Sequence, residues 1–342
     1  MLNSNYILKK YISYRRKEFI TSNFQTLLFE SCYYLILFIL FTFTFYSCRK
    51  VIDVELPSKE GKIVINSFFN NNESLIINIS KSLHILDNKE SKLLDDAIVN
   101  IYENNVFKEK LTNINNGNYI ANTFIPSFDK LYKVNVSYPD LKDAYSENMI
   151  PMPIKIISID TSTVYTTNNN TGMNQNGGNS YPQYQLKIKF KDNESVKNFY
   201  SLNVFVKNQN SYIKSSQNIQ LNNYYPIYFT STDLIIESMQ NNATAFFSDD
   251  FINGKEYVII INIDKYNFPN TNNEVLVVLN SVSEDYFLYS KSYNLYQSVK
   301  GNPFAEPVQV YNNIENGYGI FAGYSSDTLG LNLAGYNYYP IE

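Results

Sequence analysis

The 342-residue sequence has no tryptophan, one histidine and two cysteines, and each shortage excludes a kind of chemistry. Cys32 and Cys48 both lie near the N-terminus, so the rest of the chain can form no disulfide, thiolate zinc site or cysteine nucleophile. The single histidine, His84, excludes a metal site built from several histidines and argues against a Ser-His-Asp triad. We interpret His84 as a residue at the surface or at the end of a strand.

Charge of either sign is also scarce, at 18% of residues, and the formal net charge is −4. The residues before Cys48 carry more cations than anions, so the chain without them is more acidic than the whole. A protein that binds nucleic acid needs a basic face. We therefore expect no nucleic-acid partner.

Apolar and aromatic residues, by contrast, are plentiful. Hydrophobic residues make up 44% of the chain, which is enough for a packed core. The 31 tyrosines and 23 phenylalanines suit the pleated surface of a sheet. The composition therefore predicts a folded, mostly β protein.

The N-terminal segment has the order of a secretory signal. Cations between Lys9 and Lys17 precede an apolar run from Tyr33 to Ser47, and Cys48 follows. This run of about 15 residues is shorter than the ~20 residues that a helix needs to span a bilayer. We predict that residues 1–47 are a signal peptide, with a permanent transmembrane anchor as the alternative.

Cys48 is the one residue to which the sequence assigns a chemical role. The segment Phe45-Tyr46-Ser47-Cys48 resembles the lipobox of bacterial lipoproteins, although Phe45 and Tyr46 are bulkier than usual. In that motif the cysteine thiol receives a diacylglyceryl group, and cleavage then exposes the cysteine amine. We predict lipidation at Cys48. Because Arg49 is not the aspartate that retains lipoproteins at the inner membrane, we expect delivery to the outer membrane.

After a tether at residues 48–61, residues 62–150 are predicted to form an N-terminal β-sandwich. Short segments of alternating apolar and polar residues are separated by turn residues such as Asn104-Asn105. The strand candidates are residues 62–69, 74–80, 97–104, 106–112, 118–124 and 132–138. The segments "DDAIVNIYEN" and "YKVNVSY" resemble the transthyretin-like or carboxypeptidase-regulatory type of sandwich.

Residues 151–342 are predicted to form a second β-rich domain, separated from the first by the proline segment "IPMPI". The strand candidates are residues 154–165, 184–190, 199–206, 224–230, 257–264 and 274–282. Residues 166–182 are polar and rich in asparagine, so we predict a mobile loop there. The predicted fold class is thus all-β, with two β-sandwich-like domains after an N-terminal signal segment.

One amphipathic helix is predicted over residues 284–300, within the second domain. Ser283 can cap its start, and Lys300-Gly301 can end it. A helical wheel places the aromatic and aliphatic residues on one side of the helix. We expect this side to cover a sheet, and the alternative is an aromatic ridge that binds a partner. The residues of this side are Tyr286, Leu288, Tyr289, Tyr293, Leu295, Tyr296 and Val299.

Motifs for catalysis or for a bound cofactor or metal are scarce. Gly317, Gly319 and Gly323 lack the spacing of a dinucleotide-binding loop, and we interpret them as turn or bulge glycines beside a strand. The segment "DDFING", residues 249–254, lacks the ligand pattern of an EF-hand and predicts a polar hairpin turn. We assign no catalytic, cofactor-binding or metal-binding residue, and we expect no cofactor and no enzymatic activity.

Several segments together resemble one family, the Bacteroidetes-type outer-membrane lipoproteins of unassigned function that are often encoded beside TonB-dependent receptors. The matching segments are "CRKVIDVELP", "KIVINSFF", "DDAIVNIYEN", "KIKFKDNESVKNFYSLNV", "SVSEDYFLYSKSYNLYQ" and, most specific of all, "NPFAEPVQVYNNIENGYGIFAGYS". This resemblance implies a location at the outer membrane and a role linked to transport through a TonB-dependent receptor. It implies no enzymatic reaction.

The leading hypothesis for function is a lipid-anchored accessory or ligand-capturing partner of a TonB-dependent receptor. One alternative is a structural or adhesive module of the cell surface. A weaker alternative is a hydrolase that acts on extracellular glycans or peptides, because the sequence shows no recognisable catalytic group. A small-molecule or glycan ligand is compatible with the sequence, which does not identify it.

Overall fold

The computed structural model describes residues 33, 35–39, 41, 61–83, 91–167, 180–207, 224–240, 243–268, 274–333 and 338–340. The chain divides into two compact units, Met1–Ser58 and Lys59–Glu342. In the first unit the described residues are helical and their apolar side chains are exposed. Among all described residues, no helix has the length and apolar character needed to cross a membrane. Cys48 and His84 lie outside the described residues.

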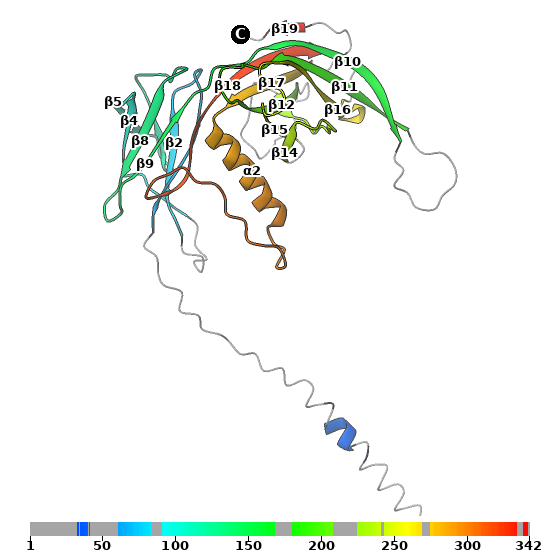
Figure 1. Cartoon of the computed structure of the whole chain (residues 1–342). Coiled ribbons are helices and arrows are strands. Elements are labelled where there is room, and N and C mark those ends of the chain that lie inside the picture. The colour runs from blue at the N-terminus through cyan, green and yellow to red at the C-terminus, as the bar shows by residue number, and fades with distance from the viewer. Residues whose placement is uncertain are drawn as a thin grey trace, which may run out of the picture. The chain divides into compact units, whose positions relative to one another are not determined.

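The described residues of the second unit form a β structure with one α-helix (Figure 1), which confirms the predicted all-β class. The strands are β1 Ile63–Phe69, β2 Ile76–Lys81, β3 Lys92–Leu93, β4 Ile98–Glu103, β5 Val106–Lys110, β6 Thr112–Asn113, β7 Asn118–Ile120, β8 Leu131–Ser137, β9 Ala144–Met149, β10 Ile156–Thr167, β11 Ser180–Lys191, β12 Phe199–Lys207, β13 Tyr224–Pro226, β14 Ile236–Gln240, β15 Thr244–Ser248, β16 Glu256–Asp264, β17 Glu274–Val282, β18 Tyr318–Asn332 and β19 Tyr338–Pro340. The helical segments are the 3-10 helix η1, Lys265–Asn267, and the helix α2, Glu284–Val299.

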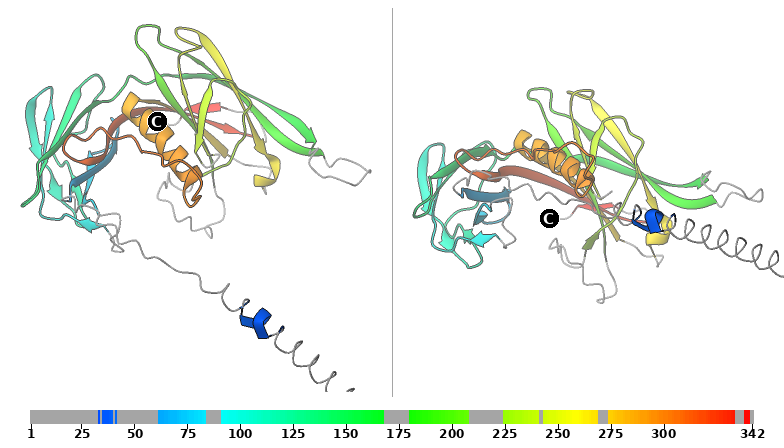
Figure 2. Two further views of the ribbon diagram at one scale, coloured as in Figure 1. Left: turned by 60° about the horizontal axis from the view of Figure 1, so that its bottom comes forward. Right: turned by 90° about the horizontal axis from the view of Figure 1, so that it is seen from below.

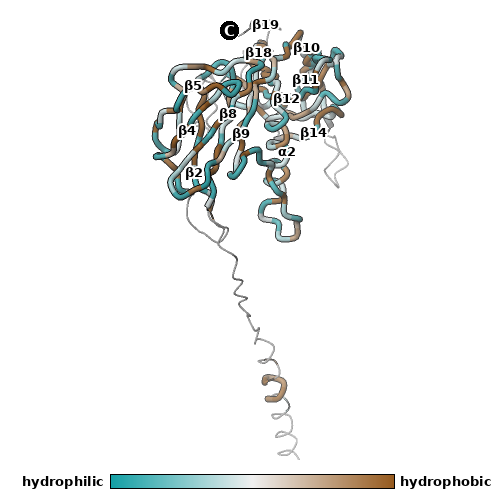
Figure 3. Tube along the Cα trace, turned by 60° about the vertical axis from the view of Figure 1, so that its left-hand side comes forward, coloured by the Kyte–Doolittle hydropathy of each residue, from teal (hydrophilic) through white to brown (hydrophobic). Residues whose placement is uncertain are grey.

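The first sandwich packs the sheet β5-β4-β8-β9 against β1, β2, β7, β6 and the first part of β18. Its core lies between the two sheets, where Ile65, Val99, Val134 and Phe321 are completely buried. Apolar and polar residues are interspersed along β4 and β8 (Figure 3), and buried positions alternate with more exposed ones along β4, β8 and β9, as the strand period of two requires. The Asn104-Asn105 turn between β4 and β5 has positive φ angles, which asparagine tolerates better than most residues.

The second sandwich packs the sheet β10-β11-β16 against β14, β15, β12, β17 and the last part of β18. Each strand contributes inward side chains, such as Ile188 of β11 and Leu202 of β12. The hairpin β10–β11 remains paired as far as Thr167 and Ser180. The ends of the predicted loop 166–182 are therefore strand residues, because cross-strand pairing extends beyond the apolar positions. Residues 168–179 lie outside the described part.

Strand β18 belongs to both sandwiches. Residues 318–323 pair in parallel with β1, and residues 324–332 pair antiparallel with β17. Within the described residues a single sheet of 12 strands therefore runs through both predicted domains, and Figure 2 shows β18 as one long strand. The sequence did not predict a strand here, because its glycines indicated turns.

The glycines of β18 serve close backbone approach rather than turns beside a strand. A Cβ at Gly319 would lie 2.0 Å from the Ile65 carbonyl oxygen, and a Cβ at Gly323 would lie 2.3 Å from that of Met149. Neither distance is compatible with a side chain. The interpretation as turn or bulge glycines was therefore wrong for Gly319 and Gly323, because glycine inside a strand also permits another backbone to come close. It was correct for Gly317, which lies in the turn directly before β18.

Helix α2 lies along one face of the shared sheet (Figure 2). The Ser283 hydroxyl accepts a hydrogen bond from the Tyr286 N–H at 3.4 Å, so the predicted start holds, and the helix ends at Val299, one residue before the predicted end. The predicted buried side is partly wrong, because Phe287 and Ser290 are the buried residues and Leu295 is 55% exposed. Phe287 packs on Phe199 of β12, and the small Ser290 lets the helix approach the sheet.

Candidate functional site

A cleft of about 800 Å³ lies where the two sandwiches meet, and we call it the junction cleft. One wall is the end of β9 with the connecting segment up to Lys155. The opposite wall is the loop between β11 and β12, residues 192–198, which we call the cleft loop. The start of α2 and the end of β17 complete the lining. The cleft is thus built from segments that are distant in sequence.

A polar network ties the start of α2 to the first sandwich at this cleft. The Asn148 side chain donates from Nδ2 to Asp285 Oδ2 at 2.5 Å and accepts the Gly323 N–H at 2.9 Å. The Tyr311 hydroxyl donates to Asp285 Oδ1 at 2.5 Å. Burial, and then the bond to Asp285, raise the pKa of Tyr311, so this phenol stays protonated and continues to donate. Asp285 therefore joins three separate segments.

Apolar groups supply the other part of the cleft surface. The side chain of Met152 is 61% exposed and that of Val196 is 57% exposed, and both line the cleft. The Lys197 ammonium lies 5.4 Å from the centre of the Phe199 ring, within the range of a cation–π contact. The lining thus combines apolar surface, hydrogen-bonding groups and charges of both signs.

Buried carboxylates hold the cleft loop in place. Asp192 accepts hydrogen bonds from the Tyr200 hydroxyl and from the Gly254 N–H, the latter at 2.8 Å. Asp249 accepts the Asn198 N–H at 2.7 Å. Both carboxylates are nearly inaccessible to solvent, at 3% exposure. The predicted turn at residues 249–254 is observed, and it fixes the loop through Asp249 and Gly254.

A second hollow, of about 860 Å³, lies beside α2, and we call it the α2 groove. Its lining comes from β14, from one side of α2 and from residues 309–312. Leu288, Leu295 and Val310 are among its apolar lining residues. The α2 groove is therefore bounded by a helix and by two pieces of extended chain.

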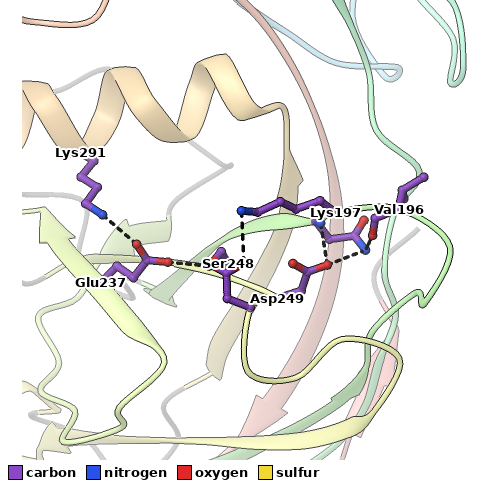
Figure 4. Close-up of polar contacts among 8 residues, drawn as sticks. Val196, Lys197, Glu237, Ser248, Asp249 and Lys291 are labelled. Atoms are coloured by element: carbon purple, nitrogen blue, oxygen red, sulfur yellow. Dashed lines mark hydrogen bonds and ion pairs between the residues drawn. The ribbon is translucent and has the colours of Figure 1, made fainter.

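A row of polar contacts connects the α2 groove with the cleft loop (Figure 4). Lys291 forms an ion pair with Glu237 at 2.7 Å, and the Ser248 hydroxyl donates to Glu237 at 2.6 Å. The same hydroxyl lies 3.1 Å from Asp250, which forms an ion pair with Lys197 at 3.1 Å. Burial opposes the ionisation of Glu237, but the bonds from Lys291 and Ser248 outweigh it and lower its pKa. Glu237 is therefore ionised at neutral pH.

The tyrosines of α2 pack mainly on one another. The rings of Tyr289 and Tyr293 are stacked, with centroids 5.8 Å apart and planes 6° apart, and Tyr296 lies next to Tyr293. Phe68 of β1 contacts Tyr286 and Tyr289. Because the stacked rings cover one another's faces, this row offers little open aromatic face for a sugar ring.

Sequence reasoning missed the residues of the junction cleft. Asn148, Asp192 and Asp285 carried no motif for a site. A signal for Asp192 was its position directly after an apolar strand. The predicted site residue, Cys48, lies outside the described residues. Among the described residues, no group of three or more histidine, cysteine or acidic side chains could hold a metal ion.

The fold and the cleft define the class, an all-β protein of two sandwiches that share one sheet and enclose a cleft at their junction. This chain belongs to the family described as "Domain of unknown function (DUF4249)", whose model matches residues 49–329. The matched range includes β1 to β17, α2 and most of β18, so the predicted membership of a family without assigned function is confirmed. The comparison with curated proteins gave no match.

Proposed function

We propose that this chain is a lipid-anchored outer-membrane protein that captures a ligand in the junction cleft and works with a TonB-dependent receptor. The N-terminal order of cations, apolar run and Cys48 supports the anchor. The resemblance to outer-membrane lipoproteins supports the location and the receptor. The cleft supports ligand capture.

The junction cleft is the observation that carries this proposal. Its volume of about 800 Å³ lies within the range of roughly 300–1,000 Å³ that is typical of ligand pockets, which favour the contacts between domains. Exposed apolar groups such as Met152 and exposed charged groups such as Lys155 both line the cleft. A ligand with both apolar surface and polar groups fits this lining.

Lipidation of Cys48 is tested by metabolic labelling of native cells with an alkyne analogue of palmitate. The full chain should take up the label, and the Cys48→Ser variant should not, because only the thiol can receive the diacylglyceryl group. Mass spectrometry of the mature N-terminus should show an acylated Cys48 as the first residue. An unmodified Cys48 still joined to Ser47 contradicts the proposed anchor.

Ligand capture is tested by native mass spectrometry of the full chain purified from native outer membranes. We expect a bound small molecule that is lost in Val196→Trp, because the larger side chain fills the junction cleft. Val106→Trp is the matched control, since Val106 is 63% exposed on β5 and does not line the cleft. A molecule retained by both variants, or absent from all preparations, contradicts capture in this cleft.

The receptor is tested by affinity purification of the anchored protein from native membranes with and without cross-linking. We expect a TonB-dependent receptor to co-purify with the chain. The Val196→Trp variant should recover the same amount of receptor as the parent, because the junction cleft is proposed to bind the ligand and not the receptor. If no receptor is recovered and deletion of the chain leaves receptor-dependent uptake unchanged, the partnership is wrong. Binding to host or matrix polymers without any receptor supports the adhesive alternative instead.

A further inference from the structure

The α2 groove has extended backbone on two of its sides. On one side is β14, which ends the order of the shared sheet and pairs only with β15 among the described strands. On the other side are residues 309–312, which belong to no regular element. Within the described part of the chain, no backbone hydrogen bond joins these two sides. The space between them is therefore not closed by the protein's own sheet.

An edge strand such as β14 has backbone N–H and C=O groups on its outer side that can pair with another chain. The pairing of β14 with β15 also shifts in register between Ile236 and Ser238, and such a bulge is a common feature of sheet edges. Side chains of β14 are held by α2, because Lys291 binds Glu237 and Asn294 donates to Ser238 at 3.0 Å. Glu237, Ser238 and Met239 of β14 line the α2 groove, so this end of the described sheet is held in place beside the groove.

We propose that the α2 groove binds an extended peptide segment of a partner protein, which adds to β14 as a further strand. Main-chain hydrogen bonds to β14 supply a sequence-independent part of the affinity. Leu288, Leu295 and Val310 offer apolar surface to alternate side chains of the peptide. Because side chains of a strand point alternately to its two faces, we expect the groove to favour a peptide in which apolar and uncharged polar residues alternate.

The groove suits a peptide better than a lipid chain or a sugar. A lipid chain leaves the outer backbone groups of β14 without partners, and an unpaired buried backbone group is costly. A sugar ring favours an open aromatic face, and the groove lining contains Tyr311 as its single aromatic residue. The Tyr311 N–H and hydroxyl already donate to Ser292 and Asp285.

The test uses the full chain in detergent and a fluorescein-labelled peptide of about seven alternating valine and threonine residues with a lysine at each end. Fluorescence anisotropy should show saturable binding. The same peptide with alternate amides N-methylated should lose binding by at least about tenfold, because it cannot donate to β14. Equal binding of both peptides, or no binding of the unmodified peptide, overturns the proposal.

Two protein variants locate the binding. Leu295→Glu should weaken binding by about tenfold, since it places a charge in the groove at a position that is already exposed. Leu234→Glu is the matched control at a side chain that is 94% exposed and does not line the groove, and it should bind as the parent does. Equal weakening by both variants contradicts the assignment to the groove. Val196→Trp should leave peptide binding unchanged, which separates this inference from the junction cleft.

Discussion

A single buried carboxylate, Asp192, fixes one wall of the junction cleft. It accepts hydrogen bonds from Tyr200 and from the Gly254 N–H, and it is 3% exposed. Replacing it with alanine leaves a buried donor, the Tyr200 hydroxyl, and a partly buried one, the Gly254 N–H, without this partner, and a buried donor without a partner costs about 1–3 kcal/mol. We expect Asp192→Ala to lower the free energy of unfolding by about 2–4 kcal/mol in urea titrations.

The control for this loss is Asp96→Ala, at an exposed turn residue, which should change stability by less than about 0.5 kcal/mol. Tyr200→Phe should cost less than Asp192→Ala, because it removes one donor and leaves the Gly254 bond intact. If the two aspartate variants are equally stable, Asp192 does not hold the cleft loop in the way described.

A second carboxylate, Glu237, gives the fold a dependence on pH. Its pKa is lowered from the ordinary value of 4.5 in the folded state. A lowered pKa means that Glu237 stabilises the fold above the pKa of the unfolded chain and that this contribution is lost as the pH falls through the folded value. Chemical unfolding between pH 7 and pH 3 should show a shallower acid decline for Glu237→Gln than for the parent. The exposed Glu306→Gln variant should follow the parent curve.

Single residues were predictable where the contact is local. Ser283 was predicted as a helix cap and Asn104-Asn105 as a turn, because each acts within three or four residues of chain. The bond between Asn148 and Asp285 joins residues that are 137 positions apart. No pattern in one sequence indicates such a pair, so the network of the junction cleft could not be predicted.

Among the elements, α2 and β18 show the same limit. The ends of α2 follow from capping groups that are near in sequence, and they were predicted to within one residue. Its buried side depends on which side chains of the sheet face the helix. Phe287 contacts β12 and Tyr286 contacts β1, and these two residues lie on different sides of the helical wheel. In β18 the glycines that hid the strand allow close backbone approach, Gly319 to β1 and Gly323 to the end of β9.

Gly323 is the glycine of β18 that tests this account. A Cβ there would lie 2.3 Å from the Met149 carbonyl oxygen, so Gly323→Ala forces the backbone apart where β9 leads into the connecting segment. We expect a loss of about 1–3 kcal/mol in the free energy of unfolding, as for other overpacked sites. Gly301→Ala is the contrast, because a Cβ there meets nothing within 4 Å and only the φ of +85° is unfavourable. A smaller loss at Gly323 than at Gly301 would show that the close approach is not rigid.

At the scale of the whole molecule, the shared sheet decides how the chain folds. The sequence predicted a boundary near residue 150, and the two largest buried apolar clusters of the described residues lie one in each sandwich. Yet Phe321 and Ile314, from the far end of the chain, are buried in the core of the first sandwich. The alternation of apolar and polar residues predicts the strands and the face that each strand turns toward the core. It does not predict which strands pair, so it could not indicate the pairing of β1 with β18.

The two sandwiches should therefore unfold together, and the first should not fold alone. A fragment of residues 59–150 lacks β18, so β1 becomes an open edge and the core loses Phe321 and Ile314. We expect this fragment to give poorly dispersed amide resonances, and residues 59–342 to unfold in one transition seen equally by circular dichroism and tyrosine fluorescence. Two separate transitions, or a well-dispersed spectrum of the fragment, contradict this coupling, because either result means that the first sandwich reaches a stable core without the strand that the second sandwich also uses.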